Sequence, residues 1–428
     1  MRHRLSPREN LELYLYAMKW LLIAALLSGV IGTGCAGFAY ALEWATRARE
    51  NLPWLLYALP VAGVLIGLSH RYFGKTVEGG ALVVDEIHEP NAGDSGRETA
   101  LSLFGTLATH LCGGSAGWEG PVMKAGGSLG SFFARKLDML TAEDRRTALM
   151  TGVAGGFGAI FGTPLAGMVF AVEILGIDKL RFESLFPCLM AGLFSKWICG
   201  AWGVRRADFH LQGTAGAAVA PALPLMLKAA LAGICFGLIG VLFSEALRGS
   251  RRLFRKVRQP LLRPVIGAAA IIALAWLFDT RDFLGLGVTS ANPGAITIFS
   301  SLHGDAIPRW SWAGKALFTA ATFGSGFKGG EVTPLLYIGA AFGNMLAQLL
   351  GESPILFAAL GFVGVFAGAT SAPLACTIMG LELFGSEHIT LFAIACFSAD
   401  FVGHSGIFPP STRTLTAILR DFGSDENH

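Results

Sequence analysis

Long apolar segments of unequal length recur along the whole chain of 428 residues. Some reach the about 20 residues that a helix needs to span a bilayer, whereas others are too short or are interrupted by glycine or proline. Irregular backbone at membrane depth must be enclosed by protein or by a watery cavity, because lipid offers no hydrogen bonds. The pattern predicts an all-α, polytopic membrane protein whose partial helices meet in its interior. The apolar segments are 11–44, 52–68, 100–112, 149–175, 185–202, 221–247, 264–278, 310–323, 335–350, 354–368 and 389–402.

The composition agrees with a multi-pass protein that is surrounded by membrane lipid. Hydrophobic residues make up 53% of the chain and charged residues 15%, with a mean hydropathy of +0.55. The net charge is only +3, and no block of basic residues interleaved with aromatic ones suggests a nucleic-acid partner. The seven cysteines are scattered without a C-x-x-C pair, so we expect buried free thiols.

Two pairs of similar segments occur in the same order along the chain. In the first pair, glycines stand five and nine residues after Pro121 and after Pro334, and Glu119 and Glu331 precede these prolines. In the second pair, FGTPLAGMVFAVEIL is matched by ATSAPLACTIMGLELF roughly 210 residues later. The ordered double match predicts two related halves, as in many transporters.

The distribution of basic residues predicts that the two halves are inverted. Arginines precede the first apolar helix, whereas a basic cluster follows the segment 221–247, which opens the second half. Because positive flanks lie in the cytoplasm, these two helices should run in opposite directions. We therefore expect a first membrane repeat at 1–202, an extracellular or periplasmic linker at 203–220, and a second repeat with a short tail at 221–428.

Glycine-rich turns that lead into helices are candidate anion sites. Their backbone N–H groups lack helical partners, and the helix dipole adds about half a positive charge at that end. Several such ends converging would hold an anion without a buried cation, although glycines also permit close helix packing. The candidate turns lie at 79–81, 117–120, 329–333 and 403–408, and the first two give Gly80, Ala81, Gly117 and Gly120 as anion-binding residues.

Glu119 stands inside one of these turns. A carboxylate at mid-membrane costs about 2.5 to 3.5 kcal/mol, so its presence there suggests a function. When ionised it could occupy the position of a transported anion, and protonation would remove its charge and release it. Proton and anion would then compete through one residue. The alternative is a structural ion pair with a nearby cation such as Lys124.

No metal-ligand cluster and no set of nucleophile, base and orienting residue has a plausible spacing, so we predict no metal, no cofactor and no enzymatic activity. A membrane-embedded hydrolase that uses Glu119 and a histidine is the alternative from another class. His110 and His404 are the histidines nearest the motifs and are candidates either for proton relay or for simple packing. Lys315 and Lys328 flank the second motif, where they could attract anions or lie at the membrane interface.

The motifs resemble a known family. GSAGWEGP with its following glycines is similar to the gating-glutamate motif of the CLC chloride channels and anion/proton exchangers, and the likeness extends from the first helix to about Thr414. SGFKGGEVTP at 325–334 resembles the fluoride/proton antiporter branch. The resemblance implies a CLC-type inverted repeat of tilted and partial transmembrane helices. It also implies a homodimer in the cell (inner) membrane that exports fluoride while protons enter.

The resemblance further assigns roles to individual residues. It implies that Glu119 is the external gate, Glu331 a second carboxylate in the pathway and Thr333 an anion-facing hydroxyl. Phe408 stands in place of the anion-contacting tyrosine and could offer its positive ring edge to an anion or simply pack. Trp118 replaces the arginine that usually precedes the gating glutamate.

Two further departures concern chloride transport. Ile174 stands where the chloride/proton exchangers carry an internal proton-transfer glutamate, and Glu173 before it is expected to be structural, like its counterpart Glu382. The segment 79–82 lacks the serine that contacts chloride. Both features point away from ordinary chloride transport, although the methionine expected of the fluoride branch is absent from 79–82 as well. The alternative within the family is a chloride or broad-anion channel, or a chloride/proton exchanger.

Overall fold

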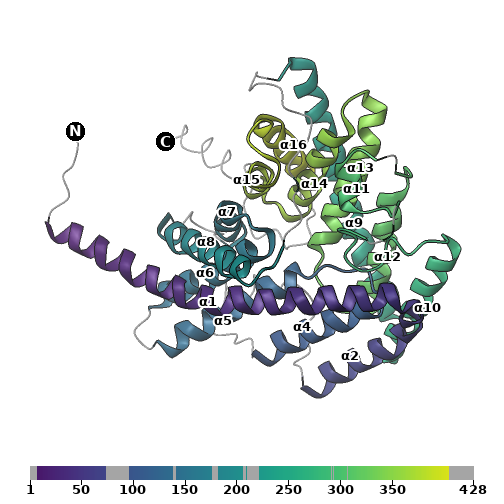
Figure 1. Cartoon of the computed structure of the whole chain (residues 1–428), viewed down its shortest axis with the longest axis horizontal. Helices are drawn as coiled ribbons and strands as arrows, with labels where there is room; N and C mark the ends of the chain where they lie inside the picture. The colour runs from purple at the N-terminus through teal and green to yellow at the C-terminus, as the bar shows by residue number, and fades with distance from the viewer. Residues whose placement is uncertain are drawn as a thin grey trace, which may run out of the picture.

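The computed structural model describes residues 7–73, 96–137, 141–175, 182–205, 209, 221–290, 292, 294–305 and 307–403. These residues form α-helices joined by short connections, and the described part contains no β-strand (Figure 1). The helices of the first half are α1 (Pro7–Asn51), α2 (Leu59–Phe73), α4 (Gly96–Leu111), α5 (Glu119–Lys136), α6 (Ala142–Phe161), α7 (Pro164–Leu175) and α8 (Leu185–Ala201), with 3-10 turns η1 (Pro53–Ala58) and η2 (Phe182–Ser184).

The second half begins with another long helix. Its helices are α9 (Leu223–Arg255), α10 (Leu262–Leu277), α11 (Ile298–Leu302), α12 (Ser311–Gly324), α13 (Val332–Leu350), α14 (Pro354–Thr370), α15 (Pro373–Phe384) and α16 (Ile389–Val402). Most of the expected linker at 203–220 lies outside the described residues, so the boundaries of the two repeats stay a prediction.

Helix lengths are as uneven as the sequence indicates. Within the described residues, four helical stretches are long and apolar enough to cross a membrane: Leu11–Asn51, Pro53–Phe73, Leu223–Arg255 and Val332–Leu350. Six further apolar helices have only 10–17 residues. The predicted all-α architecture of complete and partial helices is therefore confirmed.

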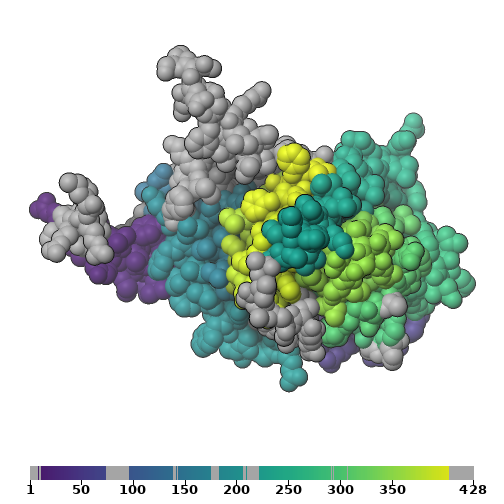
Figure 2. All heavy atoms as spheres, turned by 90° about the horizontal axis from the view of Figure 1, so that it is seen from above, coloured from purple at the N-terminus to yellow at the C-terminus, as the bar shows by residue number. Residues whose placement is uncertain are grey.

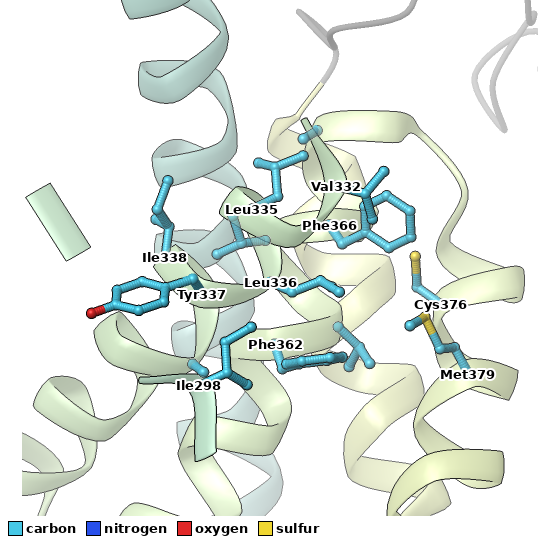
Figure 3. Packing of buried hydrophobic residues seen from close by; sticks show 14 of the residues in the cluster. Ile298, Val332, Leu335, Leu336, Tyr337, Ile338, Phe362, Phe366, Cys376 and Met379 are labelled. Atoms are coloured by element: carbon cyan, nitrogen blue, oxygen red, sulfur yellow. The ribbon is translucent and has the colours of Figure 1, made fainter. Parts of the chain in front are cut away.

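The two halves share one apolar core. Seen from outside, teal segments of the first half lie directly against green and yellow segments of the second (Figure 2). The centre of the core is formed by α13 and α14, and in α14 every residue from Leu356 to Thr370 is buried. Side chains of α13 such as Leu336 pack toward Phe362 of α14, while Met379 of α15 lies beside them (Figure 3). By contrast, α1 exposes one apolar face, including Leu22 and Leu26. The long helices α1 and α9 thus expose apolar surface, whereas α14 and the long helix α13 lie in the interior. All seven cysteines are free, and six of them are buried, as expected.

The repeated glycines allow neighbouring helices to touch. A Cβ added to Gly126 of α5 would overlap the carbonyl oxygen of Gly152 in α6. In the second half, a Cβ on Gly339 of α13 would overlap the carbonyl oxygen of Gly361 in α14 in the same way. The glycine five residues after each proline therefore serves helix packing.

Reciprocal helix caps join the second pair of similar segments. The Glu173 carboxylate of α7 accepts hydrogen bonds from the backbone N–H groups of Leu374 and Ala375 at the start of α15, at 3.1 and 2.8 Å. Glu382 of α15 accepts from the first N–H groups of α7 at 3.2 and 2.8 Å. A carboxylate at a helix N-terminus satisfies free donors and the dipole. Both glutamates are thus structural, as expected for Glu173.

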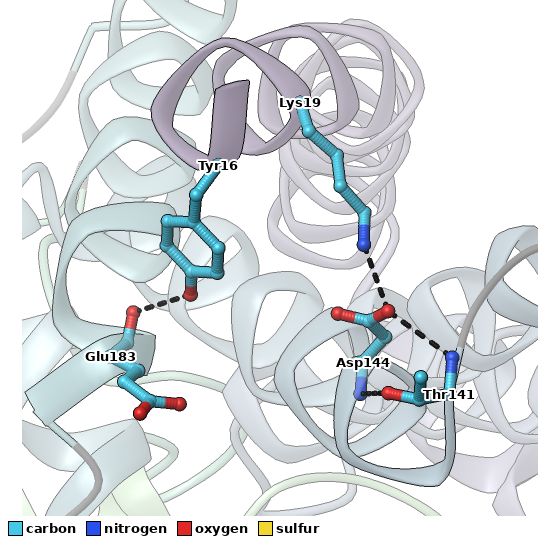
Figure 4. Close-up of polar contacts among 5 residues, drawn as sticks. All are labelled: Tyr16, Lys19, Thr141, Asp144 and Glu183. Atoms are coloured by element: carbon cyan, nitrogen blue, oxygen red, sulfur yellow. Dashed lines mark hydrogen bonds and ion pairs between the residues drawn. The ribbon is translucent and has the colours of Figure 1, made fainter. Parts of the chain in front are cut away.

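The beginning of α1 is attached to the beginning of α6. Thr141 caps α6, and the Asp144 carboxylate accepts from the Thr141 N–H and from Nζ of Lys19, the latter at 2.8 Å (Figure 4). The hydroxyl of Tyr16 donates to the carbonyl oxygen of Glu183 at 2.9 Å. These contacts fix the first turns of α1 against the first repeat.

Candidate functional site

The two glycine-rich motifs meet at equivalent residues. Gly117 N–H donates to the carbonyl oxygen of Gly330, and Gly330 N–H donates to that of Gly117, both at 2.7 Å. At the spacing that relates Pro121 to Pro334, Gly117 corresponds to Gly330. The contact therefore brings the N-termini of α5 and α13 together, as two turns aimed at one point require.

Glu119 is buried at this junction, with 3% of its surface exposed. Its Oε2 accepts from the backbone N–H groups of Trp118 at 3.0 Å and Thr333 at 3.2 Å. Its Oε1 accepts from the Thr333 hydroxyl. The carboxylate of α5 thus fills the N-terminal end of α13, where unpaired N–H groups and the helix dipole favour a negative charge.

Glycine is required on both sides of the carboxylate. A Cβ on Gly117 would overlap Glu119 Oε2 and would lie 2.9 Å from the Thr333 hydroxyl oxygen. A Cβ on Gly330 would lie 2.9 Å from the backbone nitrogen of Gly120. The Gly117 N–H already donates to Gly330, so Gly117 can contribute to the predicted anion site only through its small size. Thr333, in contrast, offers two hydrogen-bond donors, its backbone N–H and its hydroxyl.

Glu331 has a different environment from Glu119. It occupies the N-cap position of α13, and its Oε1 accepts from Nη2 of Arg251 in α9 at 2.6 Å. At the spacing of the two prolines, Glu331 corresponds to Trp118 and not to Glu119. The sequence did not indicate this ion pair, although Arg251 belongs to the basic cluster that was used to orient the second half.

The alternative role expected for Glu119, an ion pair with Lys124, is wrong, whereas the packing role of His110 is supported by direct contacts. Lys124 Nζ lies 4.0 Å from a carboxylate oxygen of Glu98, while the Glu119 carboxylate binds Trp118 and Thr333. His110 is fully buried, and its ring nitrogens lie 2.7 and 2.9 Å from the carbonyl oxygens of Thr106 and Ala116. These bonds hold the imidazole against the turn before Glu119 and favour a packing role.

Two residues of the first motif, Trp118 and Ser115, have neutral neighbours. The Trp118 ring packs on Phe38 of α1, with ring centroids 6.1 Å apart. The hydroxyl groups of Ser115 and Thr319 lie 3.0 Å apart and connect the first motif with α12. Lys315 is completely buried, so its expected alternative as a membrane-interface lysine is wrong. Gly80, Ala81, His404 and Phe408 lie outside the described residues.

Within the described ranges, no group of three or more His, Cys, Asp or Glu residues could hold a metal ion. What the junction offers is a protonatable carboxylate at the N-terminal end of a helix, a position that favours negative charge.

Comparisons with known proteins cover almost the entire chain. A family described as "Voltage gated chloride channel" matches residues 62–404. A "Chloride/fluoride channel protein" of Pseudomonas syringae pv. tomato is 40% identical over 409 residues, which is 94% of this chain and 88% of that protein. The solved structure of a CLC-type fluoride/proton antiporter is 30% identical, with a TM-score of 0.84 over 96% of this chain and 100% of that one. A slow cyanobacterial Cl−/H+ antiporter is 22% identical, with a TM-score of 0.74 over 99% and 100% of the two chains, and supports the fold alone.

Proposed function

The chain belongs to the voltage-gated chloride channel family, the CLC anion transporters and channels, and we propose that it is a fluoride/proton antiporter that exports fluoride. The names of the two most informative relatives support this choice, because one is a chloride/fluoride channel protein and the other a fluoride/proton antiporter. The segment SGFKGGEVTP, which supplies Glu331 and Thr333, supports the fluoride branch.

The observation that carries the proposal is the position of the Glu119 carboxylate at the start of α13. Three donors, from Trp118 and Thr333, bind it there. A fluoride ion carries the same charge and accepts the same hydrogen bonds, so ion and carboxylate compete for one position. Protonation neutralises Glu119 and weakens its hold on the helix dipole. Fluoride then enters as the protonated side chain leaves, which couples one movement to the other.

Counter-movement follows from this competition. Before Glu119 returns to the end of α13 and displaces fluoride, its carboxyl group must lose its proton. In the proposed exchange this proton is released on the side opposite to the one by which fluoride leaves. Glu331 is proposed as the second carboxylate of the proton route, held near α9 by Arg251. The further residues proposed to surround the anion are Gly80, Ala81, Gly120 and Phe408.

The test is transport in proteoliposomes loaded with potassium fluoride. We expect electrogenic fluoride efflux accompanied by proton uptake, with chloride moving far more slowly. Glu119→Gln should abolish or uncouple exchange, because a neutral amide cannot compete as an anion. Glu352→Gln is the matched control, since this carboxylate pairs with Lys228 at 2.6 Å away from the junction. Coupled exchange that persists in Glu119→Gln would disprove the gating role.

The name of the Pseudomonas relative also favours a second candidate, a channel that conducts both chloride and fluoride. The same assay separates the two. A channel would pass both anions without moving protons, and a chloride/proton exchanger would move chloride at least as fast as fluoride.

We further propose that the protein is a homodimer with one pathway per subunit, embedded in the lipid of the cell (inner) membrane. The family resemblance supports this assembly, and the apolar exposed face of α1 supports the lipid contact. Mass photometry or light scattering of the detergent complex tests the dimer, and a monomer at transport-competent concentrations would contradict it.

A further inference from the structure

Lys315 of α12 has a fully buried ammonium group that faces backbone oxygens. Its Nζ donates to the carbonyl oxygens of Phe283 at 3.1 Å and Gly285 at 2.7 Å. It also lies 5.3 Å from the centroid of the Tyr337 ring, a weaker electrostatic contact. An ammonium group has three N–H donors, so one remains after the two carbonyl bonds.

Arg49 places a second cation at the same residue. This arginine lies in the last turn of α1, and its Nη1 is buried without a hydrogen-bond partner among the described residues. Its guanidinium lies directly against Gly285, because a Cβ added to this glycine would overlap Nη1. Gly285 has a φ of +60°, a conformation that favours glycine. Free donors of both cations therefore converge beside one glycine.

No described carboxylate forms an ion pair with either cation, which distinguishes them from other cations of the described part. Arg251, Lys228 and Lys19, for example, each bind a carboxylate at 2.6 to 2.8 Å. Buried charges in proteins are normally paired, because an uncompensated charge away from water is strongly unfavourable. The fully buried ammonium of Lys315 and the buried Nη1 of the partly buried Arg49, neither in an ion pair with a described carboxylate, would be stabilised by a bound anion.

The cation pair adjoins the turn that leads to Glu119. Gly285 N–H donates to the carbonyl oxygen of Gly114 at 3.1 Å, and a Cβ on Gly113 would lie 3.5 Å from Cδ of Arg49. Arg49 is only partly buried and Lys315 lies near the first turn of α12, so the pair lies at the end of the bundle where α1 finishes. By the predicted orientation of α1, this end faces the outside.

We propose that Arg49 and Lys315 form a second anion-binding position, which takes a small inorganic anion on the outer side of Glu119. The site rests on the proposed function only for the identity of that anion. While the Glu119 carboxylate occupies the end of α13, an anion leaving or approaching from outside is held at the cation pair. The donors are a guanidinium N–H and an ammonium N–H, which suit a compact halide.

Isothermal titration of the purified, detergent-solubilised protein with sodium fluoride, and separately with sodium chloride, tests this site. Arg49→Gln should weaken binding of the anion by at least about tenfold, which corresponds to about 1.4 kcal/mol. Arg47→Gln is the matched control, because Arg47 lies on the same helix, is exposed and pairs with Glu43. Its affinity should stay within about twofold of the unmodified protein. Equal affinity of Arg49→Gln and the unmodified protein, or an equal loss in both variants, would overturn the proposal.

Two additional variants keep the result independent of folding and of the proposed transport. Arg49→Lys retains the charge and should retain most of the binding, while Lys315→Met should reproduce the loss seen for Arg49→Gln, each checked by size-exclusion profile. If Arg49→Gln loses chloride binding but liposomes show no fluoride/proton exchange, the proposed function fails and the site stands. If exchange is normal and Arg49→Gln binds fluoride as the unmodified protein does, the site alone fails.

Discussion

Removing the Thr333 hydroxyl should change the fluoride affinity by very different amounts, depending on whether Glu119 can ionise. The hydroxyl donates to the Glu119 carboxylate, and we propose that it donates to fluoride when the ion takes that place. A hydrogen bond to a charged group contributes about 1.5 to 3 kcal/mol, or about 10- to 150-fold in affinity. In a Glu119→Gln background, where no carboxylate competes, Thr333→Val should therefore weaken fluoride binding by about that factor.

With Glu119 intact, the same substitution removes one bond from the ion and one from its competitor. Because fluoride displaces the carboxylate, the two losses largely cancel, and the apparent fluoride affinity should change by less than about threefold. The difference between the two backgrounds corresponds to a coupling energy between Glu119 and Thr333 of more than about 1 kcal/mol. Calorimetric titration with fluoride of the unmodified protein, the Glu119→Gln variant, the Thr333→Val variant and the double variant measures this coupling energy. Thr333→Ser is the control that keeps the hydroxyl. Equal weakening in both backgrounds would refute the alternation of ion and carboxylate at one position.

Three further substitutions test the supporting structure. Gly339→Ala places a methyl group against the backbone of the next helix and should destabilise the protein by about 1 to 3 kcal/mol in thermal unfolding, whereas Gly34→Ala, with open space around it, should not. Glu382→Gln exchanges a carboxylate that accepts two N–H groups for one acceptor, so it should cost about 1.5 to 3 kcal/mol, and an unchanged melting temperature would contradict the cap. Arg251→Gln leaves the carboxylate at the start of α13 without its partner and should lower the number of protons moved per fluoride, while Arg248→Gln, paired on an exposed helix face, should leave that ratio unchanged.

The architecture was largely predictable because lipid imposes simple rules on the chain. Segment 335–350 was predicted to be apolar and the turn at 329–333 to lead into a helix, and α13 begins within that turn, at Val332. The duplicated prolines and glycines predicted a relation between halves, and the bridge between Gly117 and Gly330 lies at equivalent positions. Local pattern determined these features, so sequence was sufficient.

Contacts between distant segments were not predictable in the same way. Arg251 is one of several arginines at the end of a helix, and nothing in their spacing distinguishes the one that reaches Glu331. Arg49 and Lys315 are far apart in sequence, and their shared contact at Gly285 depends on how α1 and α12 pack against the turn that contains this glycine. The sequence placed Lys315 at the membrane interface or in a vestibule, but burial is a property of its neighbours.

The register of the repeat explains why the glutamates of the two duplicated motifs have different partners. At the spacing of the prolines, Trp118 and Glu331 are equivalent, and so are Glu119 and Val332. The first half therefore presents its carboxylate one residue later than the second, which at the start of a helix turns the side chain by about 100°. Glu119 consequently points across the bridge into α13, while Glu331 points away toward Arg251. An anion pathway needs such asymmetry, because two carboxylates aimed at the same helix ends would repel each other and leave no position for the ion.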